Sequence, residues 1–384
     1  MAETRDCYKT IAYLTFASFP SKAAHSVHIM SMCASLSHLG YGVQLFGNLI
    51  EGTEDILKFY GTQEVIFFQD VRIRNVRFVG RILALIRSFF LVKKHKPDLM
   101  YTRDVFNGLM ASMSKIPFVF ELHEIPSNRI RTLILKRIVR SPGLRRLIFI
   151  SSKMKQRFEK EFPGLGTEGI IAHDGVDIEK YAELPPSDVL RKRFDLPQEF
   201  PIVGYAGSLF PGRGGEVILP LARSFPDVRF LVVGGEGEYL ERFQQETVRT
   251  NLTNVISIGF VPHSSVPGYL SACDVLLMPY QRAVLHRQSR HDTVQYMSPL
   301  KMFEYLASGV PVISSRLPAL EEVLQDGKNS LLVEPDRIEA WKEALNKLLS
   351  DRIYGKVLAN QAKKDVTSYS WMERARLIMD FSQE

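Results

Sequence analysis

The sequence is poor in cysteine: Cys7, Cys33 and Cys273 are the three present, and they lie far apart among 384 residues. An odd number at such spacing builds neither a disulfide framework nor a CxxC metal knuckle, so we exclude a disulfide-stapled domain and expect a reducing, cytoplasmic setting. Metal patterns are missing too, since the 9 histidines form no HExxH spacing and no DxD sequence occurs. We therefore expect no metal ion and no other cofactor.

Long apolar runs are also missing. The most lipid-like segment, Arg81–Val92, is interrupted by Arg87 and is far shorter than the roughly 20 residues that cross a bilayer. The first residues show neither the apolar core nor the small-residue cleavage pattern of a secretion signal. The sequence therefore predicts no membrane span and no signal peptide.

Positive charge is unevenly distributed. Residues 1–183 carry 26 Lys and Arg against 18 Asp and Glu, whereas residues 184–384 carry 23 against 24. Within the first part, residues 72–146 hold 17 basic and 4 acidic side chains. This stretch includes 129–146, whose apolar and cationic positions suit an amphipathic helix on anionic lipid. We expect peripheral binding to the inner face of the cytoplasmic membrane; a solvated basic face is the alternative. No nucleic-acid module accompanies the charge, so we expect no nucleic-acid partner.

Strand-like apolar runs alternate with helix-period segments, which is typical of parallel sheets covered by helices on both faces. The fold class is therefore α/β. We expect one Rossmann-like unit over residues 1–183 and a second over 184–369, with the proline-rich stretch 178–200 between them. The amphipathic segment 370–384 is expected to pack back on the first unit. Expected strands of the first unit are Thr10–Phe16, Gly42–Phe46, Asp98–Tyr101, Phe118–Glu121, Arg146–Ile150 and Gly169–Ala172, with a helix over Ser26–Leu39.

The stretch Ser298–Ser315 reads SPLKMFEYLASGVPVISS, in which a polar loop leads into a short helix, a glycine turn and a buried strand. Free backbone N–H groups and the positive end of such a helix bind phosphate, and Pro299 suits its first position. Glu304 follows about one turn later, where a carboxylate can accept hydrogen bonds from vicinal hydroxyls such as those of a ribose. The alternative is a solvated helix glutamate.

Two further glycine-rich loops follow expected strands. The segment 205–215 (YAGSLFPGRGG) has glycines that permit close backbone approach and one cation, Arg213, that can bind a diphosphate bidentately. The segment 234–239 (GGEGEY) resembles the start of a dinucleotide motif, but Leu240 stands where GxGxxG needs its last glycine. A nicotinamide-dependent oxidoreductase is therefore disfavoured.

His123 follows an expected strand of the first unit, where it is either a site residue or a structural histidine.

Together these motifs resemble the family 4 retaining glycosyltransferases, which have the GT-B fold of two Rossmann-like domains facing across a cleft. The resemblance rests on SPLKMFEYLASGVPVISS, the loop with Arg213, His123, the segment 173–177 (HDGVD), the loop after Pro20 and the segment 101–104 (YTRD). It implies transfer of a hexose-type sugar from a nucleoside diphosphate sugar, UDP before GDP, to a glycan or lipid-linked acceptor without a metal. Surface polysaccharide or glycolipid synthesis in bacteria is the expected setting.

The resemblance also implies roles for single residues. Glu304 would bind the donor ribose, Arg213 would hold the diphosphate, and His123 would contact the donor sugar; these three are the expected catalytic residues. The expected donor-binding residues are Gly207, Ser208, Arg213, Phe260, Val261, Ser298, Pro299, Leu300, Lys301 and Glu304. The expected acceptor-binding residues are Pro20, Ser21, Lys22 and Arg103.

Two departures from the family pattern leave alternatives open. Tyr296 occupies the place of a first glutamate that many members have, and Ser208 and Arg213 replace an arginine and a lysine. An inactive nucleotide-binding subunit and a nucleotide-sugar epimerase are therefore the alternatives to a transferase.

Overall fold

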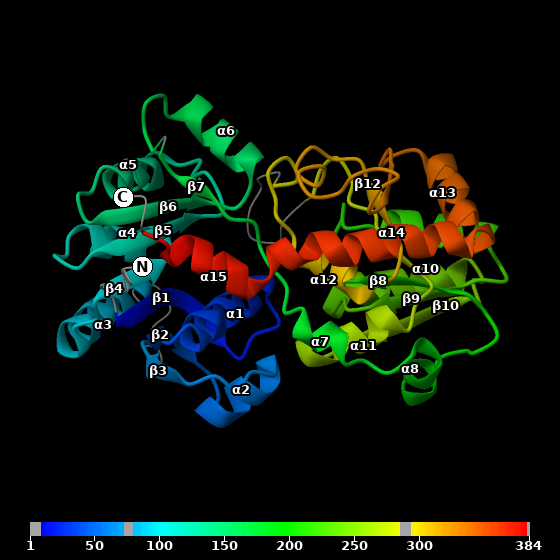
Figure 1. The fold of residues 1–384 in the computed structure, drawn as a ribbon, viewed down its shortest axis with the longest axis horizontal. Coiled ribbons are helices and arrows are strands. Elements are labelled where there is room, and N and C mark those ends of the chain that lie inside the picture. Colours follow the sequence, from blue (N-terminus) through cyan, green and yellow to red (C-terminus); the bar gives the residue numbers. More distant parts are fainter. Residues whose placement is uncertain (1–8, 73–79, 167, 285–292, 382–384) are drawn as a thin grey trace, which may run out of the picture. The chain divides into compact units, whose positions relative to one another are not determined.

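A computed structural model describes residues 9–72, 80–166, 168–284 and 293–381 (Figure 1). The chain divides into two compact units, one made of Met1–Asp174 with Trp371–Glu384 and the other of Gly175–Ser370. Each unit contains one sheet whose strands all pair in parallel. The predicted α/β class with two Rossmann-like units is confirmed.

The sheet of the first unit has seven strands in the order β3-β2-β1-β4-β5-β6-β7. Its strands are β1 (Thr10–Phe19), β2 (Gly42–Leu49), β3 (Ile66–Asp70), β4 (Leu99–Thr102), β5 (Phe118–Leu122), β6 (Leu144–Phe149) and β7 (Ile170–Ile171). The order reverses at β1, and right-handed crossovers on either side of a reversal put helices on opposite faces of the sheet. The helices are α1 (Ala24–His38), α2 (Thr53–Tyr60), α3 (Gly80–His95), α4 (Val105–Ser112), α5 (Arg129–Val139) and α6 (Ser152–Glu161).

The edge strand β3 is absent from the sequence-based prediction. Its burial does not follow the alternation of a half-buried strand, because Phe67 is 57% exposed and only Ile66 is buried. Pairing with β2 forms this strand, and a single-sequence pattern does not show such a tertiary contact. The other strands of this sheet begin or end within a few residues of the predicted bounds.

The last helix, α15 (Trp371–Met379), belongs to the first unit and contacts α1 (Figure 1). Trp371, Arg374 and Ile378 are buried on its inner face. Arg146 of β6 holds its end, since the guanidinium donates to the carbonyl oxygens of Leu377 at 2.8 Å and Asp380 at 2.6 Å.

The sheet of the second unit has six strands in the order β10-β9-β8-β11-β12-β13. Its strands are β8 (Ile202–Ala206), β9 (Arg229–Val233), β10 (Val255–Gly259), β11 (Val275–Met278), β12 (Val312–Ser315) and β13 (Leu331–Val333). Its helices are α7 (Glu179–Ala182), α8 (Ser187–Arg193), α9 (Gly215–Ser224), α10 (Gly237–Arg249), α11 (Val266–Ser271), α12 (Leu300–Ser308), α13 (Ile338–Ser350) and α14 (Arg352–Asp365). Apolar residues pack on both faces of this sheet, with Trp341 fully buried on one and Phe303 on the other.

The helices and the cysteines agree with the composition. Among the described residues, no helix combines the length and the apolar character needed to span a membrane. Cys33 and Cys273 are buried free thiols, and Cys7 lies outside the described residues.

Candidate functional site

The carboxyl edge of the second sheet brings together the segments that the sequence singles out. The loop 207–214 leaves β8, residues 279–284 leave β11, and α12 begins beside them. In doubly wound sheets, ligands bind at this edge near the point where the strand order reverses, which here is β8. The segments predicted to hold a donor therefore meet at the usual ligand-binding position of the fold.

The loop after β8 needs its glycines because the backbone approaches other backbone closely. Gly212 has φ of +82°, and a Cβ there would lie 2.1 Å from the carbonyl oxygen of Ala283. Gly234, after β9, has φ of +106°, and a Cβ there would lie 2.5 Å from the oxygen of Gly207. Glu216 closes the loop by accepting hydrogen bonds from the amides of Gly212 and Gly214 at 2.7 and 3.2 Å.

Arg213 lies at the tip of this loop, partly buried. One terminal nitrogen donates to the hydroxyl of Tyr280 at 3.2 Å, and the guanidinium lies 5.4 Å from the centre of that ring. Its Nε atom is buried and has no hydrogen-bond partner among the described residues. The guanidinium therefore keeps donor capacity for a ligand.

Lys301 lies in the first turn of α12 and points toward the same loop. Its Nζ atom is 4.2 Å from the ring centre of Tyr205 and 5.0 Å from that of Tyr280. This nitrogen is buried without a hydrogen-bond partner in the described part of the chain, and a Cβ on Gly207 would lie 2.6 Å from it. Burial lowers the pKa of Lys301 well below its usual range, and the charge of Arg213 adds to the shift. Among the described residues, no carboxylate forms an ion pair with this ammonium.

Glu304 lies one turn further along α12, and its carboxylate contacts Nε2 of His263 at 2.6 Å. His263 belongs to the short 3-10 turn His263–Ser265 that follows β10. Both side chains are mostly buried, with 12% of Glu304 and 28% of His263 exposed. A solvated helix glutamate is therefore the wrong interpretation of Glu304.

The start of α12 differs by one residue from the prediction. Pro299 is the N-cap with extended backbone at ψ of 131°, and the helix begins at Leu300. Pro299 therefore does not occupy the first helical position, because its backbone has not yet turned into the helix. Ser298 is buried beside it, and the amide of Met302 already bonds to the carbonyl oxygen of Pro299 at 3.0 Å.

The remaining predicted donor residues lie at the same sheet edge. Ser208 is partly buried in the loop after β8, and its carbonyl oxygen accepts from the hydroxyl of Tyr205 at 2.6 Å. Phe260 and Val261 directly follow β10, with Phe260 38% exposed. Tyr296, at the place of the family's first glutamate, is 2% exposed and thus a buried side chain.

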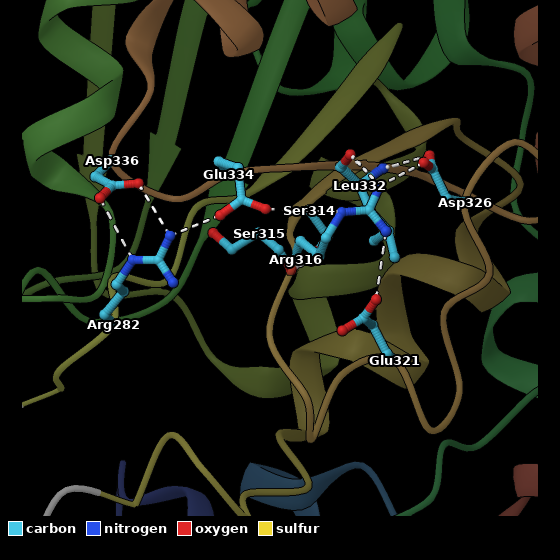
Figure 2. Close-up of polar contacts among 9 residues, drawn as sticks. All are labelled: Arg282, Ser314, Ser315, Arg316, Glu321, Asp326, Leu332, Glu334 and Asp336. Atoms are coloured by element: carbon cyan, nitrogen blue, oxygen red, sulfur yellow. Dashed lines mark hydrogen bonds and ion pairs between the residues drawn. The ribbon is translucent and has the colours of Figure 1, made fainter.

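A network of charged side chains connects the loops that leave β11, β12 and β13 (Figure 2). Arg282 contacts Glu334 at 2.6 Å and Asp336 at 3.3 Å. Arg316 contacts Asp326 at 2.5 Å and Glu321 at 3.3 Å, and it donates to the carbonyl oxygen of Leu332. These contacts lie at the rim of the same sheet edge and pair arginines with carboxylates.

The first unit contains a second polar cluster, centred on Glu121 near the end of β5. This carboxylate is fully buried, and one oxygen, Oε1, faces Arg374 of α15 at 2.9 Å and His28 of α1 at 3.1 Å. His123 contacts the same oxygen through Nε2. The other oxygen accepts from the hydroxyl of Tyr101 on β4 at 2.5 Å.

The cluster keeps Glu121 ionised and His123 neutral. Although burial by itself would raise the pKa of the Glu121 carboxyl, Arg374 and His28 hold it well below its usual range. Burial lowers the pKa of His123 to about 3, and the positive charge of Arg103 adds to the shift. Arg103 follows β4, so this predicted acceptor residue lies near His123.

The same cluster is the one group with metal-ligand spacing in the described part of the chain, since one ligand atom each from His28, Glu121 and His123 lies within 4.8 Å of the others. Arg374 already supplies a cation to the Glu121 oxygen that both histidines face. A metal ion would have to displace this guanidinium, so the residues do not suit a metal.

The other predicted acceptor residues follow β1. Pro20 and Ser21 are partly buried and Lys22 is exposed. Tyr60 of α2 fixes this loop, because its hydroxyl accepts from the amide of Ser21 at 2.8 Å and also contacts the carbonyl oxygen of Ser21 at 3.2 Å.

Several side chains around both sites escaped the sequence-based prediction: Tyr205, His263, Tyr280, His28, Tyr101 and Arg374. Two of them lie in segments that the sequence analysis singled out, Tyr101 in 101–104 and Tyr205 in 205–215. The others come from segments far from their partners in the sequence, so no local pattern marks them.

The known proteins that this chain resembles are glycosyltransferases. Residues 187–365 match the family model described as glycosyl transferases group 1. The D-inositol 3-phosphate glycosyltransferase of Corynebacterium urealyticum is 24% identical over 92% of this chain and 89% of its own length. The UDP-Gal:alpha-D-GlcNAc-diphosphoundecaprenol alpha-1,3-galactosyltransferase of Escherichia coli is 22% identical over 82% of each chain.

Solved structures agree on the fold. Sucrose-phosphate synthase from Thermosynechococcus elongatus superposes with a TM-score of 0.75 at 17% identity, covering 98% of both chains. Anabaena HepE in complex with UDP-glucose superposes with a TM-score of 0.73 at 18% identity, covering 97% of this chain and 99% of its own. The two parallel sheets and these superpositions show the GT-B fold, and the sequence matches indicate a glycosyltransferase whose residues 187–365 match the group 1 family model.

Proposed function

We propose that this enzyme transfers a hexose-type sugar from a nucleoside diphosphate sugar to a glycan or lipid-linked acceptor, with retention of anomeric configuration and without a metal. The observation that carries the proposal is the pair of buried cationic atoms, Nζ of Lys301 and Nε of Arg213, that have no partner among the described residues. Buried charges are costly unless they are paired, so an anionic ligand fits this place.

A diphosphate matches the geometry. Two cations reach Tyr280 from different segments, and the N-terminal amides of α12 lie beside Lys301. Free amides at a helix N-terminus and the positive end of the helix dipole favour phosphate oxygens. Glu304, one turn later, would accept hydrogen bonds from the ribose hydroxyls, and Phe260 and Val261 would flank the base.

The same cations would support the chemistry. Breaking the bond between the anomeric carbon and the diphosphate oxygen leaves negative charge on the phosphate, which Arg213, Lys301 and the helix amides stabilise electrostatically. The acceptor hydroxyl forms the new bond on the face that the diphosphate leaves, and its proton passes to the departing phosphate. This step needs no separate carboxylate base. Arg213 and Lys301 would stabilise the charge of the departing diphosphate, which a metal ion does in other enzymes.

Some relatives support a UDP-sugar donor and a lipid-linked acceptor, whereas a mannosyltransferase of Mycolicibacterium smegmatis depends, by its name, on GDP-mannose. HepE has been solved with UDP-glucose, and the galactosyltransferase of Escherichia coli uses, by its name, UDP-Gal and a diphosphoundecaprenol-linked sugar. We propose a UDP-sugar donor and an acceptor of the same lipid-linked class, as used in bacterial surface polysaccharide or glycolipid synthesis. His123 of the first unit would contact the donor sugar, and Pro20, Ser21, Lys22 and Arg103 would contact the acceptor.

We also propose that the first unit binds the inner face of the cytoplasmic membrane through α3 and α5. Both helices expose apolar side chains, including Ile82 and Phe90 on α3 and Ile130 and Leu133 on α5, between 61% and 71% exposed. Basic side chains accompany them within the stretch 72–146, of which residues 73–79 lie outside the described residues. Apolar insertion and attraction to anionic lipid together are the usual basis of interfacial binding.

The test is a release assay with a panel of UDP- and GDP-sugars, with and without a lipid extract, that measures free nucleoside diphosphate. We expect release that needs one donor and the extract. Arg213→Met and Lys301→Met should each lower turnover about 100-fold, the usual loss on removing one electrostatic stabiliser of a transition state. Lys356→Met, on the exposed side of α14, is the matched control.

The alternatives give other outcomes. Donor turnover without an acceptor would indicate an epimerase, and UDP binding without release from any sugar would indicate an inactive binding subunit. Normal turnover in both methionine variants would contradict the proposed site.

A further inference from the structure

The carboxylate of Glu121 is held by side chains from four different elements. Tyr101 comes from β4, His28 from α1, Arg374 from α15 and His123 from the segment after β5. Glu121 is 0% exposed, and a buried carboxylate of this kind persists when donors satisfy its oxygens. Its position is therefore determined by the tertiary structure on several sides.

Arg374 is fixed independently of Glu121. Its Nε donates to the carbonyl oxygen of His173 at 2.7 Å, and Nη2 donates to that of Ala172 at 3.3 Å. Arg374 is 4% exposed. Because these backbone carbonyls set its plane, the ion pair with Glu121 at 2.9 Å fixes the direction of the carboxylate.

This arrangement decides which nitrogen of His123 carries the proton. An ionised carboxylate only accepts hydrogen bonds, so Nε2 of His123, which contacts it, must be the donor. In a neutral ring, Nδ1 then has the lone pair. Of the two histidines in the cluster, His123 reaches the surface. Its side chain is 17% exposed, whereas that of His28 is 1% exposed.

We infer that Glu121 is a positioning residue that holds His123 in the Nε2–H tautomer, and that Arg374 of the last helix positions Glu121 in turn. The inference rests on the proposed function for its consequence: Nδ1 of His123 would accept a hydrogen bond from a hydroxyl of the sugar substrate. A histidine in the other tautomer would present an N–H group there, so the same hydroxyl would have to accept the hydrogen bond and could not donate it. The carboxyl-terminal helix thus contributes to the chemistry of a residue far away in the sequence.

The experiment uses Glu121→Gln, which keeps the shape but removes the charge, with Glu124→Gln as control. Glu124 lies three residues later, half-exposed, and contacts Arg131 at 3.5 Å. Long-range proton–nitrogen NMR of the imidazole rings reports the tautomer without needing turnover. We expect Nε2–H for His123 in the wild type and in Glu124→Gln, and a mixture of tautomers in Glu121→Gln.

In the release assay, kcat of Glu121→Gln should fall about 10- to 100-fold, the loss typical of removing a group that orients a histidine. KM for the donor should change little, because the nucleotide site lies on the second unit. Arg374→Lys should give a smaller loss of kcat, since lysine keeps the charge but not the planar contacts. Circular dichroism and the unfolding temperature show whether the first unit, which carries both substitutions, is still folded.

Two results would overturn the inference: an Nδ1–H tautomer in the wild type, or an unchanged tautomer together with unchanged kcat in Glu121→Gln. A tautomer that depends on Glu121 in a protein that transfers no sugar would support the positioning role while contradicting the proposed function, so the two failures are distinguishable.

Discussion

The carboxylate of Glu304 contacts the ring of His263 at 2.6 Å, although 41 positions separate them in the sequence. Glu304 is on α12 and His263 follows β10, so two segments of the second unit fix the direction of the proposed ribose ligand. A carboxylate held in this way binds a diol with less loss of side-chain freedom than a mobile one.

We therefore expect His263→Ala to weaken UDP binding several-fold and Glu304→Gln to weaken it about 10- to 100-fold, since hydrogen bonds to a charged group contribute about 1.5–3 kcal/mol. Isothermal titration calorimetry measures both. Equal affinity of Glu304→Gln and wild type for UDP would contradict the role of Glu304.

Nucleotide binding should take up a proton at Lys301. The pKa of Lys301 is lowered by burial and by Arg213 in the free protein, and a diphosphate would raise it by supplying the missing negative charge. Because the complex then binds more protons than the free protein, affinity for UDP should rise as pH falls between the two pKa values and should decline as pH rises through that of the complex.

Calorimetry in buffers with different protonation enthalpies measures this proton uptake. We expect Lys301→Met to lose it, whereas Lys356→Met should retain it. Proton uptake of the same size in Lys301→Met would place the titrating group elsewhere.

Gly212→Ala should damage the loop that carries Arg213. The new Cβ would lie 2.1 Å from the oxygen of Ala283, and φ of +82° adds strain, so the backbone must shift. We expect a loss of about 1–3 kcal/mol in stability and a weaker affinity for UDP. Gly237→Ala is the control, because φ there is +54° but nothing lies within 4 Å of the added atom. It should cost stability alone, and a loss of UDP affinity as large as that of Gly212→Ala would count against the clash.

The first unit should lose stability in weak acid. The pKa of His123 is lowered from 6.5 to about 3 by burial and by Arg103, so the unfolded chain binds a proton there that the folded chain does not. Stability is therefore full above about pH 6.5 and declines as pH falls toward 3. Glu121 and Asp174, whose folded pKa values are lowered despite burial, add to the decline at the acidic end. Unfolding temperature against pH should be flatter below pH 6.5 in His123→Gln than in the wild type, and parallel curves would contradict this.

Membrane binding should depend on α3 and α5 jointly with lipid charge. Co-sedimentation with vesicles that contain phosphatidylglycerol should exceed that with phosphatidylcholine alone, and should fall at high salt because screening weakens surface attraction. The double variant Ile82→Ser with Phe90→Ser should bind less, since each fully inserted apolar side chain contributes about 1.5–3 kcal/mol. Ile353→Ser, 78% exposed on α14 of the second unit, is the control. Binding that ignores lipid charge would exclude the proposal.

The features that could be predicted are those that a pattern within a short stretch of sequence indicates. The alternation of apolar strands and helices predicts two parallel α/β sheets, and the motif from Ser298 to Ser315 predicts α12, Lys301 and Glu304 in one segment. Edge strand β3 escaped because its neighbour β2, rather than its own pattern, holds it in place. The helix start at Leu300 instead of Pro299 is a difference of one residue, at the kind of boundary where sequence patterns are least informative.

The sequence by itself determined the fold class, the family resemblance and the cations expected at a phosphate, because each depends on residues that are close along the chain. Only the tertiary structure decided how those residues are held. It places Lys301 between two tyrosine rings, pairs Glu304 with His263, and surrounds Glu121 with Arg374, His28 and Tyr101. Electrostatic energy depends on distance in space and on exclusion of water, and neither is visible in the order of residues.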